Sequence, residues 1–111
     1  MRPDVQSATD RVIAIRARMQ GEPAGEGARQ ECEDALSEGY AQALAGDAWL
    51  AHTEQRLHEL IDDASIPVRG RDLRLLVREH TDLERCVIEL RRELDGLRRE
   101  HDRVHVRSQS V

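Results

Sequence analysis

The chain has almost no aromatic side chains and no long apolar run. Phe is absent from its 111 residues, and Tyr40 and Trp49 are its only tyrosine and tryptophan. So little aromatic bulk argues against a large globular core, and this length allows one domain at most. No apolar stretch approaches the length of a membrane span, and none resembles the apolar part of a signal peptide. We therefore expect a cytoplasmic protein.

Lysine and asparagine are also absent, so all 17 basic residues are Arg. This usage is typical of a GC-rich bacterial coding sequence. The two cysteines, Cys32 and Cys86, lie far apart and form no CxxC pair. Together with the expected cytoplasmic location, this spacing predicts free thiols and no disulfide.

Charged residues are abundant and unevenly distributed. They make up 35% of the chain, a share typical of long helices or coiled coils when apolar residues recur at helical spacing. Residues 1–66 carry six Arg and thirteen acidic residues, whereas residues 67–111 carry eleven Arg and nine acidic residues. This asymmetry suits helices that pack on one another, or an acidic surface offered to a basic partner. It provides no strongly basic patch, so we do not expect direct nucleic-acid binding.

The strongest signal is an apolar seam near the C-terminus, in which inward positions alternate in steps of three and four. Such a narrow stripe is stable only when it packs against another helix. The seam consists of Leu73, Leu76, His80, Leu83, Val87, Leu90, Leu94, Leu97, His101 and Val104.

A weaker seam precedes it, through Leu36, Tyr40, Leu50, Leu57 and Ile61. The first half of this segment is rich in Ala and Gly, including Gly39 and Gly46, which lets a second helix approach closely. Off the two seams, exposed apolar residues could form a second interface. The candidates are Leu44, Trp49, Leu60, Leu75, Val77 and Ile88.

These patterns predict an all-α fold, an antiparallel helical hairpin or coiled coil with a short N-terminal helix. We expect that first helix within residues 1–20, capped by Ser7, then a Gly- and Pro-rich linker at 21–27. The hairpin should occupy residues 28–106, with helices at about 28–63 and 71–106 joined by a break at Pro67 and Gly70. Residues 107–111 should form a tail. The first helix either docks on the hairpin or is an independent arm.

Few residues suggest chemistry. His101 and His105 are four residues apart and could share a metal ion, but no third ligand is evident, so we predict no metal site and no cofactor. His80 and His101 occupy seam positions, where polar residues specify register or, alternatively, make association sensitive to pH. No recognisable nucleophile arrangement or phosphate-binding loop is present, so we do not expect an enzyme. Four arginines seven residues apart, Arg78, Arg85, Arg92 and Arg99, form a stripe facing away from the seam.

One segment, LVREHTDLERCVIELRRELDGLRRE, which ends at Glu100, resembles the RsiG-like anti-sigma factors of actinobacteria. The resemblance implies an antiparallel helical hairpin that holds a sigma factor inactive, in some members with cyclic di-GMP. The family's dinucleotide motif is Glu-x3-Ser-x2-Arg-x3-Gln-x3-Asp on each helix. Three positions of this chain match it, which are Glu33, Ser37 and Asp95.

The motif's other positions depart from the family pattern. Tyr40, Leu44 and Ala48 replace its Arg, Gln and Asp on one helix, and His80, Glu84, Val87 and Arg91 replace its Glu, Ser, Arg and Gln on the other. Without both arginines the sites lack the guanidinium groups that bind phosphate well, so we do not expect cyclic di-GMP binding.

The sequence thus predicts a non-enzymatic regulatory protein-binding module. Its partner would be another protein, with a sigma factor the most specific candidate, sequestered by occlusion. The alternative is a structural scaffold or adaptor formed by a homodimer or larger homo-oligomeric coiled coil. A sensor of cyclic dinucleotides is the third hypothesis.

Overall fold

The structure, a computed structural model, consists of three helices, which are α1 (Val5–Gly21), α2 (Glu26–Asp62) and α3 (Gly70–Gln109). It describes residues 2–21, 26–62 and 70–109, and the side chains of residues 2–21, 27–62 and 70–104. The molecule is elongated, with extents of 69 × 19 × 19 Å. The predicted all-α class, with two long helices and a short N-terminal one, is confirmed.

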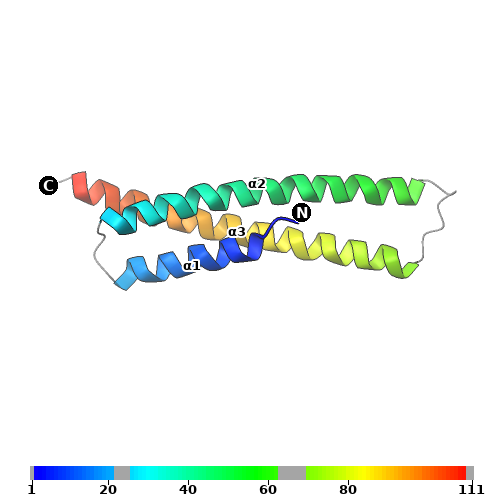
Figure 1. Cartoon of the computed structure of the whole chain (residues 1–111), viewed down its shortest axis with the longest axis horizontal. Helices are drawn as coiled ribbons and strands as arrows, with labels where there is room; N and C mark the ends of the chain where they lie inside the picture. Colours follow the sequence, from blue (N-terminus) through cyan, green and yellow to red (C-terminus); the bar gives the residue numbers. More distant parts are fainter. Residues whose placement is uncertain (1, 22–25, 63–69, 110–111) are drawn as a thin grey trace.

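The two long helices run antiparallel along the full length of the molecule (Figure 1). Each contributes a leucine-rich seam, so packing them together removes both apolar stripes from water. The bounds of all three helices differ from the expected ones. Gly21 and Gly27, placed in the predicted linker, lie inside helices, and α3 continues to Gln109 rather than ending at Val106. Residues 22–25, 110 and 111 lie outside the described part.

The first helix begins at a different cap from the one predicted. Ser7 lies within α1, where its backbone N–H donates a hydrogen bond of 3.1 Å to Asp4 Oδ1. Asp4 therefore occupies the capping position and satisfies one of the free N–H groups of the first turn. The hydrogen bonds from Ser7 lower the pKa of this carboxyl. A carboxylate also suits the positive end of the helix dipole.

Helix α1 packs against both long helices and is not an independent arm. It lies beside the half of the hairpin that holds the start of α2 and the end of α3 (Figure 1). Its inward side chains Val5, Ala8, Val12 and Ile15 are buried. Thr9 is buried beside them and remains satisfied, because its Oγ1 donates a 3.0 Å hydrogen bond to the carbonyl oxygen of Val5.

The small residues of α2 allow this close packing, as the sequence predicted. Gly39 lies directly against the side chain of Leu94, and a Cβ on Gly46 would come within 2.6 Å of Val87 Cγ2 and 3.4 Å of Val5 Cγ2. The seam of α3 and the inward face of α1 therefore both pack on α2 where the side chains of α2 are smallest.

Among the described helices, none is long and apolar enough to cross a lipid bilayer.

Candidate protein-binding surface

Burial divides the hairpin into two ends of different character. Every fully buried residue of the described ranges lies within residues 5–15, 32–46 or 83–97. We call this half, which α1 covers, the covered end. The open end comprises residues 47–62 of α2 and 70–82 of α3, and none of its residues is fully buried. Figure 1 shows that α1 begins near the middle of the hairpin and runs away from the open end.

Burial varies along the two predicted seams, and half-buried members occur in both halves of the hairpin. Five members at the covered end, Leu83, Val87, Leu90, Leu94 and Leu97, are buried. Nine others are half-buried, which are Leu36, Tyr40, Leu50, Leu57, Leu73, Leu76, His80, His101 and Val104. Ile61 was predicted to lie on the seam, but this is wrong, because it is 66% exposed. Leu60 is half-buried at this point and takes its place.

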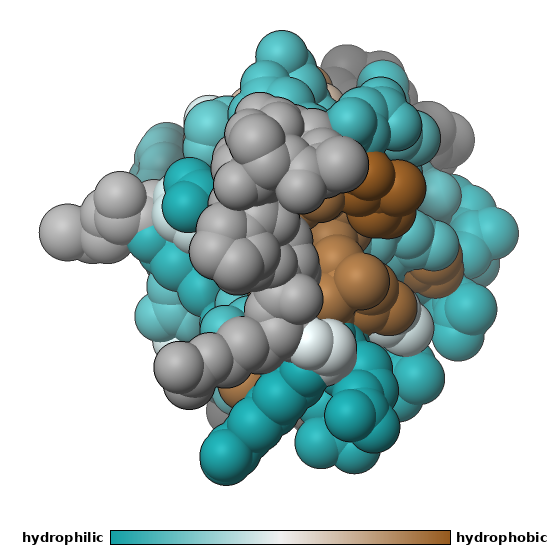
Figure 2. Space-filling view, turned by 90° about the vertical axis from the view of Figure 1, so that its right-hand side faces the viewer, coloured by the Kyte–Doolittle hydropathy of each residue, from teal (hydrophilic) through white to brown (hydrophobic). Residues whose placement is uncertain are grey.

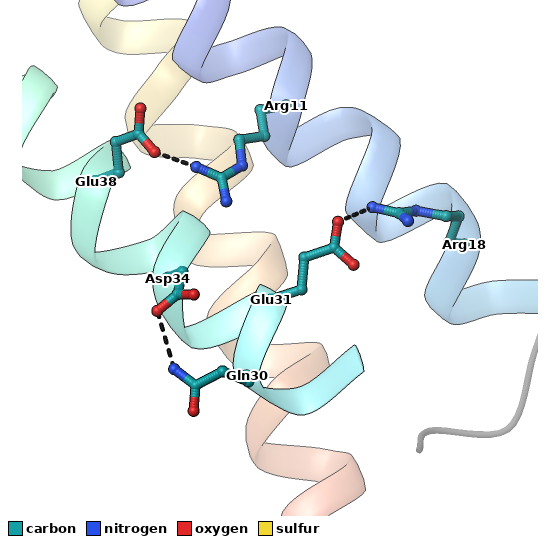
Figure 3. Close-up of polar contacts among 6 residues, drawn as sticks. All are labelled: Arg11, Arg18, Gln30, Glu31, Asp34 and Glu38. Carbon is teal, nitrogen blue, oxygen red and sulfur yellow. Dashed lines mark hydrogen bonds and ion pairs between the residues drawn. The ribbon is translucent and has the colours of Figure 1, made fainter. Parts of the chain in front are cut away.

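Ion pairs fix one flank of α1 to α2. Arg11 pairs with Glu38 and Arg18 pairs with Glu31, so basic side chains of α1 reach acids spaced seven residues apart on α2 (Figure 3). These four side chains are largely exposed, and each such pair stabilises by at most about 1 kcal/mol. Their spacing sets the register of α1 more than its stability.

The other flank of α1 is held to α3 by Arg16. Its Nη1 donates to Glu93 Oε2 at 2.7 Å, and its Nη2 donates to Glu100 Oε1 at 3.1 Å. Gly96 lies between these acids, and a Cβ on it would be 2.5 Å from Arg16 Cζ, so the glycine leaves room for the guanidinium. The hydrogen bond to Glu93 raises the pKa of Arg16, while burial acts against it. The two ion pairs of Arg16 are better shielded from water than the ion pairs that join α1 to α2.

Helix α1 lies over a furrow between the long helices, and seven-residue spacing extends the two lines of residues that form this furrow into the open end. Its floor on α3 is the line Leu97, Leu90 and Leu83, which seven-residue spacing extends to the half-buried Leu76. On α2 the floor is the line Cys32, Gly39, Gly46, Thr53 and Leu60, in which the first three are buried and the last two are half-buried. The furrow is thus uncovered beyond the N-terminal end of α1, at Val5.

Apolar side chains are exposed at the open end of the hairpin. Figure 2 views the molecule along its length from this end and shows hydrophobic side chains gathered beside the grey segment. Ile61, Leu75 and Val77 are exposed here, and Trp49 is 37% exposed at the boundary with the covered end. Trp49 and His52 also line a hollow beside Arg2 and Asp4, the residues that precede α1.

The two seam histidines face carboxylates of α2. His80 Nε2 lies 3.5 Å from Glu54 Oε1, and His101 Nε2 lies 3.4 Å from Glu33 Oε1. The structure therefore places each ring between the long helices as a polar layer. Nowhere in the described part do three His, Cys, Asp or Glu side chains gather closely enough to hold a metal ion. The side chain of His105 lies outside the described residues.

Other predicted residues take the following places. Cys32 is buried and Cys86 is half-buried, both as free thiols. The arginine stripe of α3 is exposed along its length, as the spacing predicted. At the dinucleotide-motif positions, Val87 belongs to the core, Tyr40 is half-buried and Leu44 is 66% exposed.

Residues that hold α1 were missed by the sequence reasoning. Arg16, Glu93 and Glu100 were not predicted to hold α1 on α3, although Glu93 and Glu100 are seven residues apart around a glycine. That spacing was the available signal, because two acids one heptad apart on the flank of a seam can hold one arginine between them.

No protein-family model, curated protein or solved structure matches this chain.

Proposed function

We propose that this chain is a non-enzymatic regulatory module that binds another protein through the open end of its hairpin. The observation that carries the proposal is the burial pattern. The leucine seam continues through the open end, yet none of its residues is fully buried, and Leu75, Val77 and Ile61 are exposed nearby. Figure 2 shows hydrophobic side chains gathered at this end of the molecule, and exposed apolar patches are typical of interaction sites.

The mechanism would be occlusion. A partner that covers the open end would bury the half-exposed leucines and, in doing so, lose access to its own apolar surface. A transcription protein of the sigma-factor type is the most specific candidate. It rests on the resemblance of residues 76–100 to RsiG-like anti-sigma factors, and the antiparallel hairpin is compatible with it.

The test is co-purification of the tagged full-length chain from its native host, with matched charge variants. Ile61→Asp combined with Leu75→Asp places charges on the open end. Leu44→Asp combined with Ile88→Asp is the control at the covered end, because the exposures match: 66% for both Ile61 and Leu44, and 49% and 53% for Leu75 and Ile88.

The expected result is a stoichiometric partner that the wild type and the control variant retain and the open-end variant loses, with unchanged circular dichroism in all three. A partner retained equally by both variants would contradict the assignment of the surface. Recovery of the chain only as a stable homo-oligomer would instead support the structural scaffold.

A further inference from the structure

The groove that continues past α1 has acidic flanks. On α3, Glu100 and Glu93 hold Arg16, and the line of seven-residue spacing through them passes Cys86 and reaches Glu79 and Asp72. On α2 the line through Glu31 and Glu38 passes Ala45 and His52, which line the hollow before α1, and reaches Glu59. We call the part of the furrow between Glu59 and the Asp72–Glu79 flank the open groove.

The acids of the two parts differ in their partners. At the covered end Glu31, Glu38, Glu93 and Glu100 all pair with arginines of α1. Within residues 2–21, 26–62 and 70–109, no ion pair joins Glu59, Asp72 or Glu79 to a basic side chain, and all three are exposed. Asp82, which lies two heptads before Gly96 on α3, is a fourth exposed acid. Arg56, which lies three heptads after Ala35 on α2, is an exposed base. The flanks of the open groove thus carry four exposed acids and Arg56, while Leu75 lies with Arg71, Arg74 and Arg78 in a separate hollow on α3.

Helix α1 shows what this furrow accepts. It presents four buried apolar residues to the floor and places arginines against the acids on both flanks. The open groove repeats the arrangement, with a leucine floor formed by Leu60 and Leu76 and acids on both sides. An occupant of the same chemistry would bury the floor and neutralise the flanks.

A second copy of the chain fits this groove poorly. Because α1 occupies the same face at the covered end, two open ends packed face to face about a two-fold axis would lie antiparallel, which sets α3 against α3. The acidic flank of Asp72, Glu79 and Asp82 would then meet its own counterpart, which brings like charges together.

We infer that the open groove binds an amphipathic helix of a partner protein, one with an apolar face flanked by arginine or lysine residues. The inference rests on the proposed function and specifies the chemistry of the partner. The helix lies in line with α1 and replaces water over Leu60 and Leu76. Its basic side chains contact Glu59, Asp72 and Glu79, as those of α1 contact the acids of the covered end.

The probe is a synthetic peptide with the sequence of α1 and its cap, residues 4–21, added to the full-length chain. Trp49 is the only tryptophan of the chain, and the peptide contains none, so the emission of Trp49 reports a helix docking beside the N-terminal end of α1. The control peptide replaces Arg11, Arg16 and Arg18 with Glu. The groove variant is Asp72→Arg with Glu79→Arg, and its control is Asp95→Arg with Asp102→Arg, an exposed pair with the same spacing on α3.

We expect saturable binding of the α1 peptide to the wild type and to the Asp95/Asp102 variant, weakened at least tenfold by the Asp72/Glu79 variant. The glutamate peptide should fail to bind the wild type and should bind the Asp72/Glu79 variant. Equal binding to all variants would mean exchange with α1 in its own site, and no saturation below about 1 mM peptide, a binding free energy weaker than about −4 kcal/mol, would mean no site. Either result overturns the inference, and so does a homodimer in light scattering that the Asp72/Glu79 variant abolishes.

Failure of the proposed function would look different. If the peptide binds as expected but Ile61→Asp with Leu75→Asp captures the same host proteins as the wild type, the groove chemistry holds and the regulatory role does not. If those substitutions remove a partner that the Asp72/Glu79 variant retains, the role holds and the basic-helix inference is wrong.

Discussion

At the scale of single residues, packing at the covered end depends on the absence of side chains as much as on their presence. Gly46 lies where α1, α2 and α3 meet, against Val87 and Val5. In an open helix, alanine in place of glycine stabilises by about 1 kcal/mol. Here the gain must be weighed against the space that a methyl group needs.

We predict that Gly46→Ala destabilises the protein by about 1 to 3 kcal/mol, because the new Cβ would lie 2.6 Å from Val87 Cγ2. Valine is β-branched and cannot rotate away cheaply. Gly27→Ala is the matched control, since nothing lies within 4 Å of its Cβ position, and it should be neutral or stabilise by up to about 1 kcal/mol. Urea unfolding followed by circular dichroism measures both, and equal shifts would contradict the packing described.

Burial also changes the chemistry of Cys32. Removal from water, together with the negative charges of Glu33 and Glu100, raises the pKa of its thiol from 9.0 to about 11. The folded state therefore favours the protonated thiol. Its stabilising contribution is complete below the unfolded pKa and is lost as the pH rises from 9.0 to about 11.

The prediction compares the wild type with Cys32→Ala. Alanine leaves a small cavity, so the variant should be less stable near neutral pH by about 1 kcal/mol. This difference should shrink by about 2 kcal/mol, and so disappear or change sign, as the pH rises through the interval between the two pKa values. The measurement is the free energy of unfolding of both proteins at several pH values. If the difference between them did not change with pH, the thiol of Cys32 would have the same pKa in the folded and unfolded states, and the prediction would be wrong.

At the scale of the elements, α1 is held more firmly on α3 than on α2. Arg16 has two carboxylate partners and is mostly shielded from water, whereas Arg18 and Glu31 are largely exposed. Charge-assisted hydrogen bonds in shielded positions contribute more than exposed ion pairs do.

We predict that Arg16→Met destabilises the protein by about 1 to 3 kcal/mol, because it leaves Glu93 and Glu100 as partly buried carboxylates without their cation. Arg18→Met should change the free energy of unfolding by no more than about 0.5 kcal/mol. The measurement is urea unfolding, with hydrogen exchange to follow α1 itself. Similar losses from the two substitutions would contradict the ranking of the two flanks.

The long helices, with their order and antiparallel arrangement, followed from the sequence, because a seam repeated over ten positions leaves few other ways to bury leucine. The docking of α1 did not follow. Its buried face uses small residues such as Ala8 and Thr9, and its salt bridges join residues up to 84 positions apart. Apart from the spacing of Glu93 and Glu100 around Gly96, such long-range pairs leave no local trace in the sequence.

The same reason explains the error at Ile61. Heptad spacing carries the seam to this position, but the register near the end of α2 brings Leu60 inward instead. The seam residues of the open end were identified from the sequence, whereas their incomplete burial was not. It depends on where α1 begins and ends along the hairpin, which only the packed structure defines.

At the scale of the whole molecule, the chain is a three-helix bundle at one end and a two-helix hairpin at the other. A two-helix pair has few interior positions, so its backbone hydrogen bonds are protected mainly by neighbouring turns. Local stability should therefore fall along the 69 Å length of the molecule, from the covered end to the open end.

Hydrogen exchange of the free protein should reveal this gradient. Amides within 32–46 and 83–97, where all buried long-helix residues lie, should exchange only through global unfolding, whereas those of 50–60 and 72–80 should exchange at least tenfold faster through local opening. Because a bound helix would supply the missing third element, the α1 peptide should protect the open end selectively. Uniform protection of the free chain would mean that the open end needs no cover, and the physical case for a partner at this surface would then fail.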